Sequence, residues 1–314
     1  MLRYKYHCLH PNQKITVHVE RLTHLSKIKD MILRSLKAKR LIPDWRRGPD
    51  TVERGILSIL RELDLSGFNS VDWVLSVNSE ESWERLILKR EKLVVGPNIE
   101  FGKPHISKRL QQYDDFKILS PSAWVIPIIQ ERGKWFNGQY CILPSDIDFE
   151  YWKPPKVRKN NRILIYRKFD DSNTDFFNVV SICNLLGLEY EVVTYGSYTR
   201  GSFRRTLRNC RAAIWLGTSE SQGIALLECW AMNVPTLVRR HESYVDEVTG
   251  KAFASSSAPY LVQECGQDFY SSQLDIKLIS SFLNDLSKMG PRDYAVSEFG
   301  RAILFEKLHT ILTS

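Results

Sequence analysis

The sequence lacks several patterns that mark common classes of protein. It has no run of about 18 apolar residues, the length that a membrane-spanning helix needs. Its first residues, MLRYKYHCLHPNQK, hold no apolar segment long enough for a signal peptide. The six cysteines are scattered and form no CxxC pair, which argues against a zinc site or a disulfide framework. We therefore expect a cytoplasmic protein with free thiols.

Motifs of familiar enzyme classes are missing as well. The sequence contains no GxSxG, no HExxH and no phosphate-binding P-loop signature. A DxD triplet is present at Asp146–Asp148, but it follows a proline and precedes a basic, proline-containing stretch rather than ending a strand. Three residues match often by chance, so we do not expect a metal site there.

Charge is plentiful but uneven. The net charge is +8, and residues 1–50 hold 12 basic and 4 acidic residues, so the remainder is balanced. Residues 24–47 space their apolar side chains like a helix, with Lys and Arg between them. The pattern predicts a core-packed helix with a solvated basic face, and contact with an anionic membrane is the open alternative. No nucleic-acid motif accompanies the charge, so we expect no nucleic-acid partner.

The rest of the chain alternates between strand-like and helix-like segments. With 43% hydrophobic and 25% charged residues in 314, it has the composition of an ordinary globular protein of about two domains. A stretch with two prolines and several basic residues, 148–161, interrupts the alternation and predicts a linker. Strand–helix alternation is typical of parallel sheets with crossover helices, so the fold class is α/β.

The stretch GTSESQGIALLECWAMNVPTLV holds two acids, Glu220 and Glu228, in an apolar setting. It follows a predicted strand, AAIWLG, and its helix begins near Gly223. Ligands of open parallel sheets bind beyond the carboxyl ends of strands, and a helix N-terminus attracts phosphate. A carboxylate repels a diphosphate but accepts hydrogen bonds from hydroxyls. A nucleotide sugar offers both groups.

These residues resemble a known family. ESQGIALLE resembles the Glu-x7-Glu element of retaining GT-B glycosyltransferases, especially the glycosyltransferase family 4-like group. ILIYRKFDD, ILPSDIDFEYWKPP and PRDYAVSEFG resemble that family's first C-domain strand, linker approach and C-terminal segment. The resemblance implies a GT-B architecture of two Rossmann-like domains facing a central cleft. Residues 1–152 would form the acceptor-side domain, 153–290 the donor domain, and 291–314 a helix crossing back to the first.

The resemblance also implies roles for individual residues. Glu228 would bind the donor ribose, and Glu220 would contact the donor sugar near its 3- and 4-hydroxyls. Arg167 and Lys168 would neutralise the diphosphate. His105 would reach the donor from the first domain. The remaining donor-binding residues are Ser221, Gln222, Gly223, Ile224 and Ala225. The donor is a nucleotide diphosphate sugar, the acceptor a glycan or glycolipid hydroxyl, and no metal or other cofactor is expected.

Alternatives stay open at this level. Glu228 could instead be the ion-pair partner of Arg239 or Arg240, and the polar segment 255–266 could border the donor pocket or be structural. The chain could also hold a nucleotide sugar without turnover, or be another GT-B enzyme such as a nucleotide-sugar epimerase. Release of free nucleoside diphosphate only when acceptor is added would separate these functions.

Overall fold

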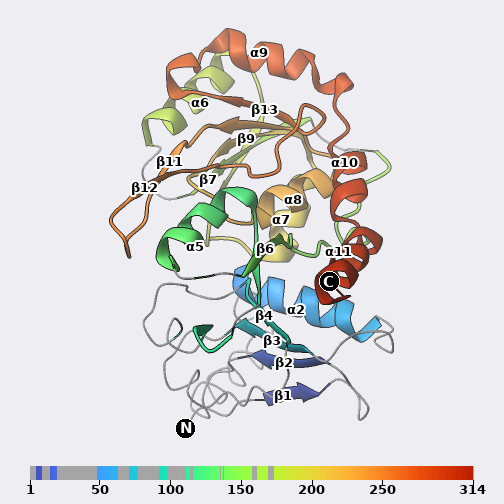
Figure 1. The fold of residues 1–314 in the computed structure, drawn as a ribbon. Coiled ribbons are helices and arrows are strands. Elements are labelled where there is room, and N and C mark those ends of the chain that lie inside the picture. Colours follow the sequence, from blue (N-terminus) through green and yellow to red (C-terminus); the bar gives the residue numbers. More distant parts are fainter. Residues whose placement is uncertain are drawn as a thin grey trace.

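Two mainly parallel sheets, one above the other in Figure 1, organise the computed structural model of the chain. The structure describes residues 5–8, 15–19, 48–62, 71–76, 92–97, 106, 110–113, 116–134, 136, 138–157, 161–168 and 173–313. The predicted basic helix at 24–47 and the candidate His105 lie outside the described residues. None of the described helices combines the length and apolarity that a membrane span requires.

The N-terminal sheet has the order β1-β2-β3-β4-β5-β6, and only the β1–β2 pair is antiparallel. Its strands are β1 (Lys5–Cys8), β2 (Ile15–Val19), β3 (Val71–Ser76), β4 (Lys92–Val95), β5 (Lys117–Ser120) and β6 (Gln139–Ile142). Helix α2 (Gly48–Glu62) precedes β3, and a 3-10 turn η1 (Ala123–Val125) with helix α5 (Ile126–Arg132) follows β5. We call these elements the N-terminal unit.

The C-terminal sheet has the order β13-β10-β9-β7-β8 and is parallel throughout. Its strands are β7 (Arg162–Arg167), β8 (Tyr190–Thr194), β9 (Cys210–Leu216), β10 (Thr236–Arg239) and β13 (Gly266–Phe269). Numbered along the chain, the spatial order is 2-1-3-4-5, a doubly wound arrangement whose order reverses between β7 and β9. That switch point is where such sheets bind ligands.

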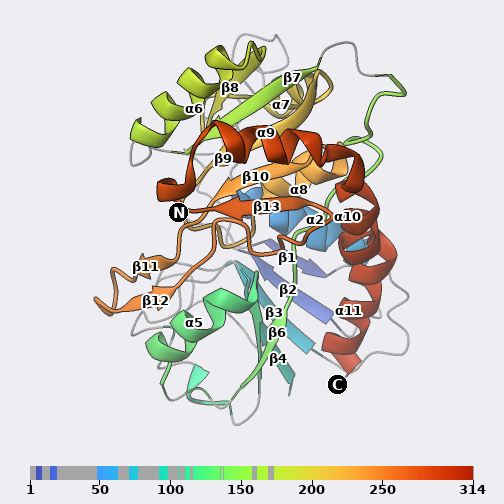
Figure 2. The same cartoon turned by 90° about the horizontal axis from the view of Figure 1, so that it is seen from above.

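Helices cover both faces of the C-terminal sheet (Figures 1 and 2). One face packs on α7 (Arg200–Leu207), α8 (Ile224–Ala231) and α10 (Pro291–Phe299), the other on α6 (Asn173–Leu185) and α9 (Ile276–Asn284). Short 3-10 turns flank α9, at η3 (Ser271–Gln273) and η4 (Leu286–Lys288). Burial on both faces explains why β7 and β9 read as continuous apolar runs. We call the sheet and these helices the C-terminal unit.

The last helix, α11 (Arg301–Thr313), packs on the N-terminal unit. Leu304 and Leu308 share a buried cluster with α2 and β3. Arg301 forms an ion pair with Glu62 of α2 at 2.6 Å, and Lys117 donates a hydrogen bond from Nζ to the Ile311 carbonyl at 2.6 Å. The chain therefore returns to its first sheet after completing the second.

Sequence reasoning missed three strands of the second half. Residues 243–254 form a hairpin of β11 (Ser243–Val245) and β12 (Ala252–Ala254), and β13 is the edge strand. The β13 segment, GQDF, carries no apolar alternation. Its position follows instead from long-range pairing with β10, where Gly266 approaches so closely that a Cβ would lie 1.9 Å from the Thr236 carbonyl oxygen. This packing contact leaves no local pattern in the sequence.

Candidate functional site

Two charged residues meet at the switch point of the C-terminal sheet. Lys168 directly follows β7, and the 217–223 loop, which follows β9, carries Glu220. The Lys168 Nζ lies 3.0 Å from the Glu220 Oε1, and the two side chains are 15% and 17% exposed. The pair is thus partly shielded from solvent at the carboxyl ends of adjacent strands, where a ligand of this fold would bind.

Glu220 is held by its backbone as well as by its side chain. Its amide donates to the Ser256 carbonyl at 2.8 Å, and its carbonyl accepts from the Trp124 Nε1 at 2.9 Å. Burial raises the pKa of the Glu220 carboxyl above its ordinary value, although the neighbouring Lys168 acts in the opposite direction. A desolvated carboxylate of this kind strengthens hydrogen bonds to any hydroxyl that enters the site.

Aromatic side chains lie beside Lys168 and pack on one another. The Lys168 ammonium lies 5.0 Å from the ring centroid of Tyr195, and the Tyr198 hydroxyl lies 3.3 Å from that of Tyr166. Tyr166 in turn stacks on Trp215, with ring centroids 3.8 Å apart and an interplanar angle of 8°. Burial, together with the charge of Glu228, raises the pKa of the Tyr198 hydroxyl. Glu228 therefore lies close enough to this aromatic cluster to act on it electrostatically.

Helix α8 begins at the edge of the site. Gly223, its N-cap, has φ 60° and ψ 35°, the left-handed conformation that glycine adopts most easily. Its backbone carbonyl accepts from the Leu227 amide at 2.9 Å, while the first amides of a helix have no acceptor within the helix itself. Ile224 and Ala225, half-buried, are the first two residues of α8. The helix thus presents its positive end toward the site.

The other loop residues predicted to bind a donor are placed differently. Gln222 is half-buried and its Oε1 contacts the Ser145 hydroxyl, whereas Ser221 is exposed. The guanidinium of Arg167 lies 4.8 Å from the ring centroid of Phe176 on α6. Of the two predicted basic residues, the structure thus places Lys168 against Glu220 and packs Arg167 on an aromatic ring.

The arginines that could have paired with Glu228 form ion pairs with other acids. The Arg239 Nη1 lies 3.2 Å from Asp175 Oδ2, and the Arg240 Nε lies 2.7 Å from Asp268 Oδ2. These contacts give no support to a structural ion pair between Glu228 and either arginine.

The DxD triplet sits in a structural setting. The carboxylate of Asp148 accepts the Tyr151 amide at 2.9 Å and lies 3.8 Å from the Arg200 guanidinium. Asp146 packs beside Gly55 of α2, and burial raises the pKa of its carboxyl. Within the described part of the chain, no three His, Cys, Asp or Glu residues gather as metal ligands would.

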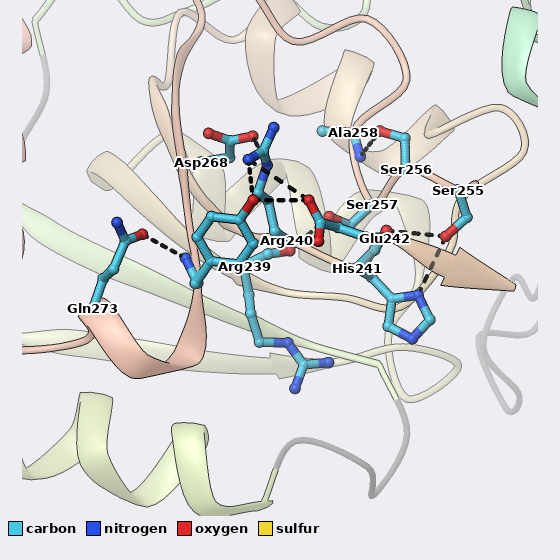
Figure 3. A network of polar contacts seen from close by, with 11 residues as sticks. Arg239, Arg240, His241, Glu242, Ser255, Ser256, Ser257, Ala258, Asp268 and Gln273 are labelled. Atoms are coloured by element: carbon cyan, nitrogen blue, oxygen red, sulfur yellow. Dashed lines mark hydrogen bonds and ion pairs between the residues drawn. The ribbon is translucent and has the colours of Figure 1, made fainter.

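A cavity of about 450 Å³ adjoins the site on the β13 side. Figure 3 shows its polar wall, which includes Arg240, His241 and the serines at 255–257. The His241 Nδ1 lies 3.0 Å from the Ser219 hydroxyl, and the Ser256 carbonyl accepts the Glu220 amide. The segment 255–258 therefore borders both the cavity and the 217–223 loop.

Sequence reasoning did not identify Trp124, Tyr195 or Tyr198. All three lie just beyond the carboxyl end of a parallel strand, β5 for Trp124 and β8 for the tyrosines. The rule that ligands bind at the carboxyl ends of parallel strands would have identified them as candidate site residues. Only contacts formed in three dimensions, however, link Trp124 to Glu220 and Tyr195 to Lys168.

Comparisons with known proteins agree with this architecture. No family model and no curated protein matches the sequence. The structure of TarM matches with a TM-score of 0.53 at 11% identity, over 77% of this chain and 55% of that one. A GtfA/B complex matches with a TM-score of 0.50 at 12% identity, over 77% and 56%. WaaG, a glycosyltransferase involved in lipopolysaccharide biosynthesis, gives 0.44 at 11%, over 94% and 85%.

The chain therefore has an α/β, GT-B architecture of two Rossmann-like units, and this fold class predicted from the sequence is confirmed. The chain spans a little over half the length of the first two matched structures, 55% and 56%. At 11% and 12% identity the likeness concerns the fold alone.

Proposed function

We propose that the chain is a retaining glycosyltransferase that moves a sugar from a nucleotide diphosphate sugar to a hydroxyl of a glycan or glycolipid. One observation carries the proposal: Lys168, Glu220 and the N-terminus of α8 converge at the switch point of the C-terminal sheet. A cation, a carboxylate and free helix amides are complementary to a diphosphate next to a polyhydroxylated sugar.

The residues divide these tasks. The amides of Gly223, Ile224 and Ala225 would meet the diphosphate, with Ser221 and Gln222 lining the same loop. Glu228 would accept hydrogen bonds from the ribose, and Glu220 from the sugar hydroxyls. A carboxylate has about four lone-pair sites, so Glu220 can keep Lys168 and still accept two hydroxyls.

The reaction then breaks the bond between the anomeric carbon and the diphosphate oxygen. The acceptor oxygen bonds to the same face of that carbon, and its proton passes to the departing diphosphate. Lys168, assisted by Arg167, stabilises the charge that develops on the leaving group, so the reaction requires no metal ion and no side-chain nucleophile. In the proposal His105 would approach the donor from the N-terminal unit.

The experiment is a thermal-shift screen of nucleoside diphosphates and their sugars on the wild type and Glu228→Ala. A ligand at about 100 times its dissociation constant adds roughly 2.7 kcal/mol of stability. We expect one nucleotide to stabilise the wild type and the Glu189→Ala control, whose acid pairs with Arg162 at the opposite end of β7, but not Glu228→Ala. No shift with any nucleotide would refute the donor site.

Transfer is tested on the ligand that the screen identifies. Free nucleoside diphosphate should accumulate only when an acceptor glycan or glycolipid is added. Conversion of the donor without acceptor would indicate an epimerase, and binding without conversion would indicate a carbohydrate-binding protein. Either result would overturn the transferase proposal while leaving the nucleotide site intact.

A further inference from the structure

Glu220 is fixed at three points, and these come from different parts of the molecule. Its carboxylate contacts Lys168 at 3.0 Å and its amide contacts the Ser256 carbonyl at 2.8 Å, both within the C-terminal unit. Its carbonyl accepts from the Trp124 Nε1 at 2.9 Å. Among the described residues, Trp124 is the one hydrogen-bond partner of Glu220 that belongs to the N-terminal unit. The position of Glu220 therefore depends on how the two units sit together.

Trp124 is itself held against the C-terminal unit. Its ring meets the Tyr244 ring on β11 edge to face, with centroids 5.9 Å apart and an interplanar angle of 66°. The helix that follows it, α5, is fastened to the same hairpin by the ion pair between Arg132 and the buried Asp246. Both views show α5 beside the β11–β12 hairpin (Figures 1 and 2). The contact with Tyr244 and the ion pair of α5 therefore hold the Trp124 indole in the orientation in which it donates to the 217–223 loop.

From these contacts we infer that Trp124 is a positioning residue for Glu220. It donates a hydrogen bond across the interface between the units and so fixes the 217–223 loop only when that interface is formed. The effect on turnover rests on the proposed function, whereas the effect on the loop does not. A carboxylate must meet sugar hydroxyls in a defined geometry, so the rate of transfer falls when the loop that carries it moves by a fraction of an ångström.

The first test measures the loop without any ligand. Amide hydrogen exchange of residues 217–223 should accelerate several-fold in Trp124→Phe, which keeps a ring but loses the N–H donor. Tyr260→Phe is the matched control, because Tyr260 also donates across the interface, to the carbonyl of Pro121 three residues before Trp124, and is not among the hydrogen-bond partners of Glu220 in the described part of the chain. Unchanged exchange in Trp124→Phe, or equal acceleration in both variants, would overturn the inference.

The second test measures the consequence for the reaction. With the donor identified above, kcat of Trp124→Phe should fall about ten-fold while KM for the donor changes less than two-fold, because the lost bond orients rather than binds. Tyr260→Phe should keep its kcat. If the wild type turns over no nucleotide sugar but exchange still accelerates in Trp124→Phe, the proposed function fails and the positioning role stands. Accelerated exchange with an unchanged kcat would refute the catalytic relevance of that role.

A third variant covers the case in which Trp124→Phe does not fold. Replacing the indole by benzothiophene, as benzothienylalanine at position 124, preserves the shape and the contact with Tyr244 but removes the N–H donor. It should reproduce the faster exchange and the lower kcat of Trp124→Phe. Wild-type values in this variant would show that the hydrogen bond to Glu220 does not position the loop.

Discussion

Two ion pairs near the interface between the units differ in how completely their carboxylates are satisfied. Asp246 is fully buried and accepts from the Arg132 guanidinium, from the Thr249 amide at 3.1 Å and from the Thr249 hydroxyl at 2.8 Å. These bonds lower the pKa of its carboxyl to about 2. Glu220 is 17% exposed, and within the described chain its carboxylate accepts from Lys168 alone.

The difference separates a structural pair from a site. Asp246 has its accepting capacity filled by the protein, so it stabilises the contact between α5 and the β11–β12 hairpin and has little left for a ligand. The Glu220 carboxylate has lone pairs that can still accept hydrogen bonds. It is also desolvated, which raises the pKa of its carboxyl. A group that is costly in the free protein and gains partners on binding is what a ligand site requires.

The largest expected loss of stability comes from breaking the ion pair between Arg132 and Asp246. Asp246→Ala should lower the free energy of unfolding by about 3 kcal/mol, because it strands the Arg132 guanidinium, which is only 17% exposed. Urea unfolding followed by far-UV circular dichroism measures it. Glu131→Ala removes a half-buried acid from the same helix, and it should change stability little because the partners of Glu131, Lys134 and Lys251, are 68% and 55% exposed and stay hydrated without it. Equal losses in both variants would contradict the assignment of Asp246 as the structural carboxylate.

The pH dependence of stability should have opposite signs at the two carboxylates. The folded pKa of Asp246, about 2, lies below its ordinary 3.8, so its contribution is present above pH 4 and is lost as the pH falls toward 2. The folded pKa of Glu220 lies above its ordinary 4.5, so its contribution is complete below that pH and is lost as the pH rises through the folded value.

Melting temperatures measured against pH test both signs. Asp246→Ala should flatten the loss of stability on the acid side. Glu220→Gln removes a desolvated charge and keeps a side-chain oxygen that can accept from Lys168, so at neutral pH it should lose less stability than Asp246→Ala, which leaves Arg132 without its carboxylate. A Glu220→Gln variant that is destabilised at neutral pH as strongly as Asp246→Ala would show that both pairs are structural.

The sequence was enough to predict the fold class and the surroundings of Glu220, but it gave no indication of the pair between Arg132 and Asp246. Alternating strands and helices, and an apolar run with two acids after a strand, predicted the α/β class and placed Glu220 at the end of β9. Local patterns sufficed there because strand and helix periodicity are local properties.

The features that the sequence did not predict depend on contacts between residues far apart in the chain. Trp124 reaches Glu220 across 96 residues of sequence, and Arg132 reaches Asp246 across 114. The three-residue strands β11 and β12 are too short to show a period. The packing that satisfies Asp246 and leaves Glu220 unsaturated thus emerges only when the two units meet.

The smallest expected changes in stability come from replacing one glycine in the candidate site and one in the β11–β12 hairpin. Gly223 in the site and Gly250 in the β11–β12 hairpin both have left-handed backbones, with φ of 60° and 68°. A Cβ at Gly250 would meet nothing within 4 Å, and at Gly223 its nearest neighbour would be Pro259 Cδ at an ordinary 3.5 Å. Alanine at either position should therefore lower stability by a similar amount, about 1 kcal/mol, from backbone strain alone.

Nucleotide binding should separate the two glycine variants. The proposed diphosphate approaches the backbone at the start of α8, so Gly223→Ala should weaken the affinity for the nucleotide sugar several-fold in calorimetric titration, whereas Gly250→Ala should leave it unchanged. Gly223→Asn should recover stability, because Asn tolerates the left-handed conformation, but not affinity, because its side chain still occupies the space beside the helix start. Full affinity in Gly223→Ala would place the diphosphate away from α8 and leave Lys168 and Glu220 as the only elements of the proposed site still supported.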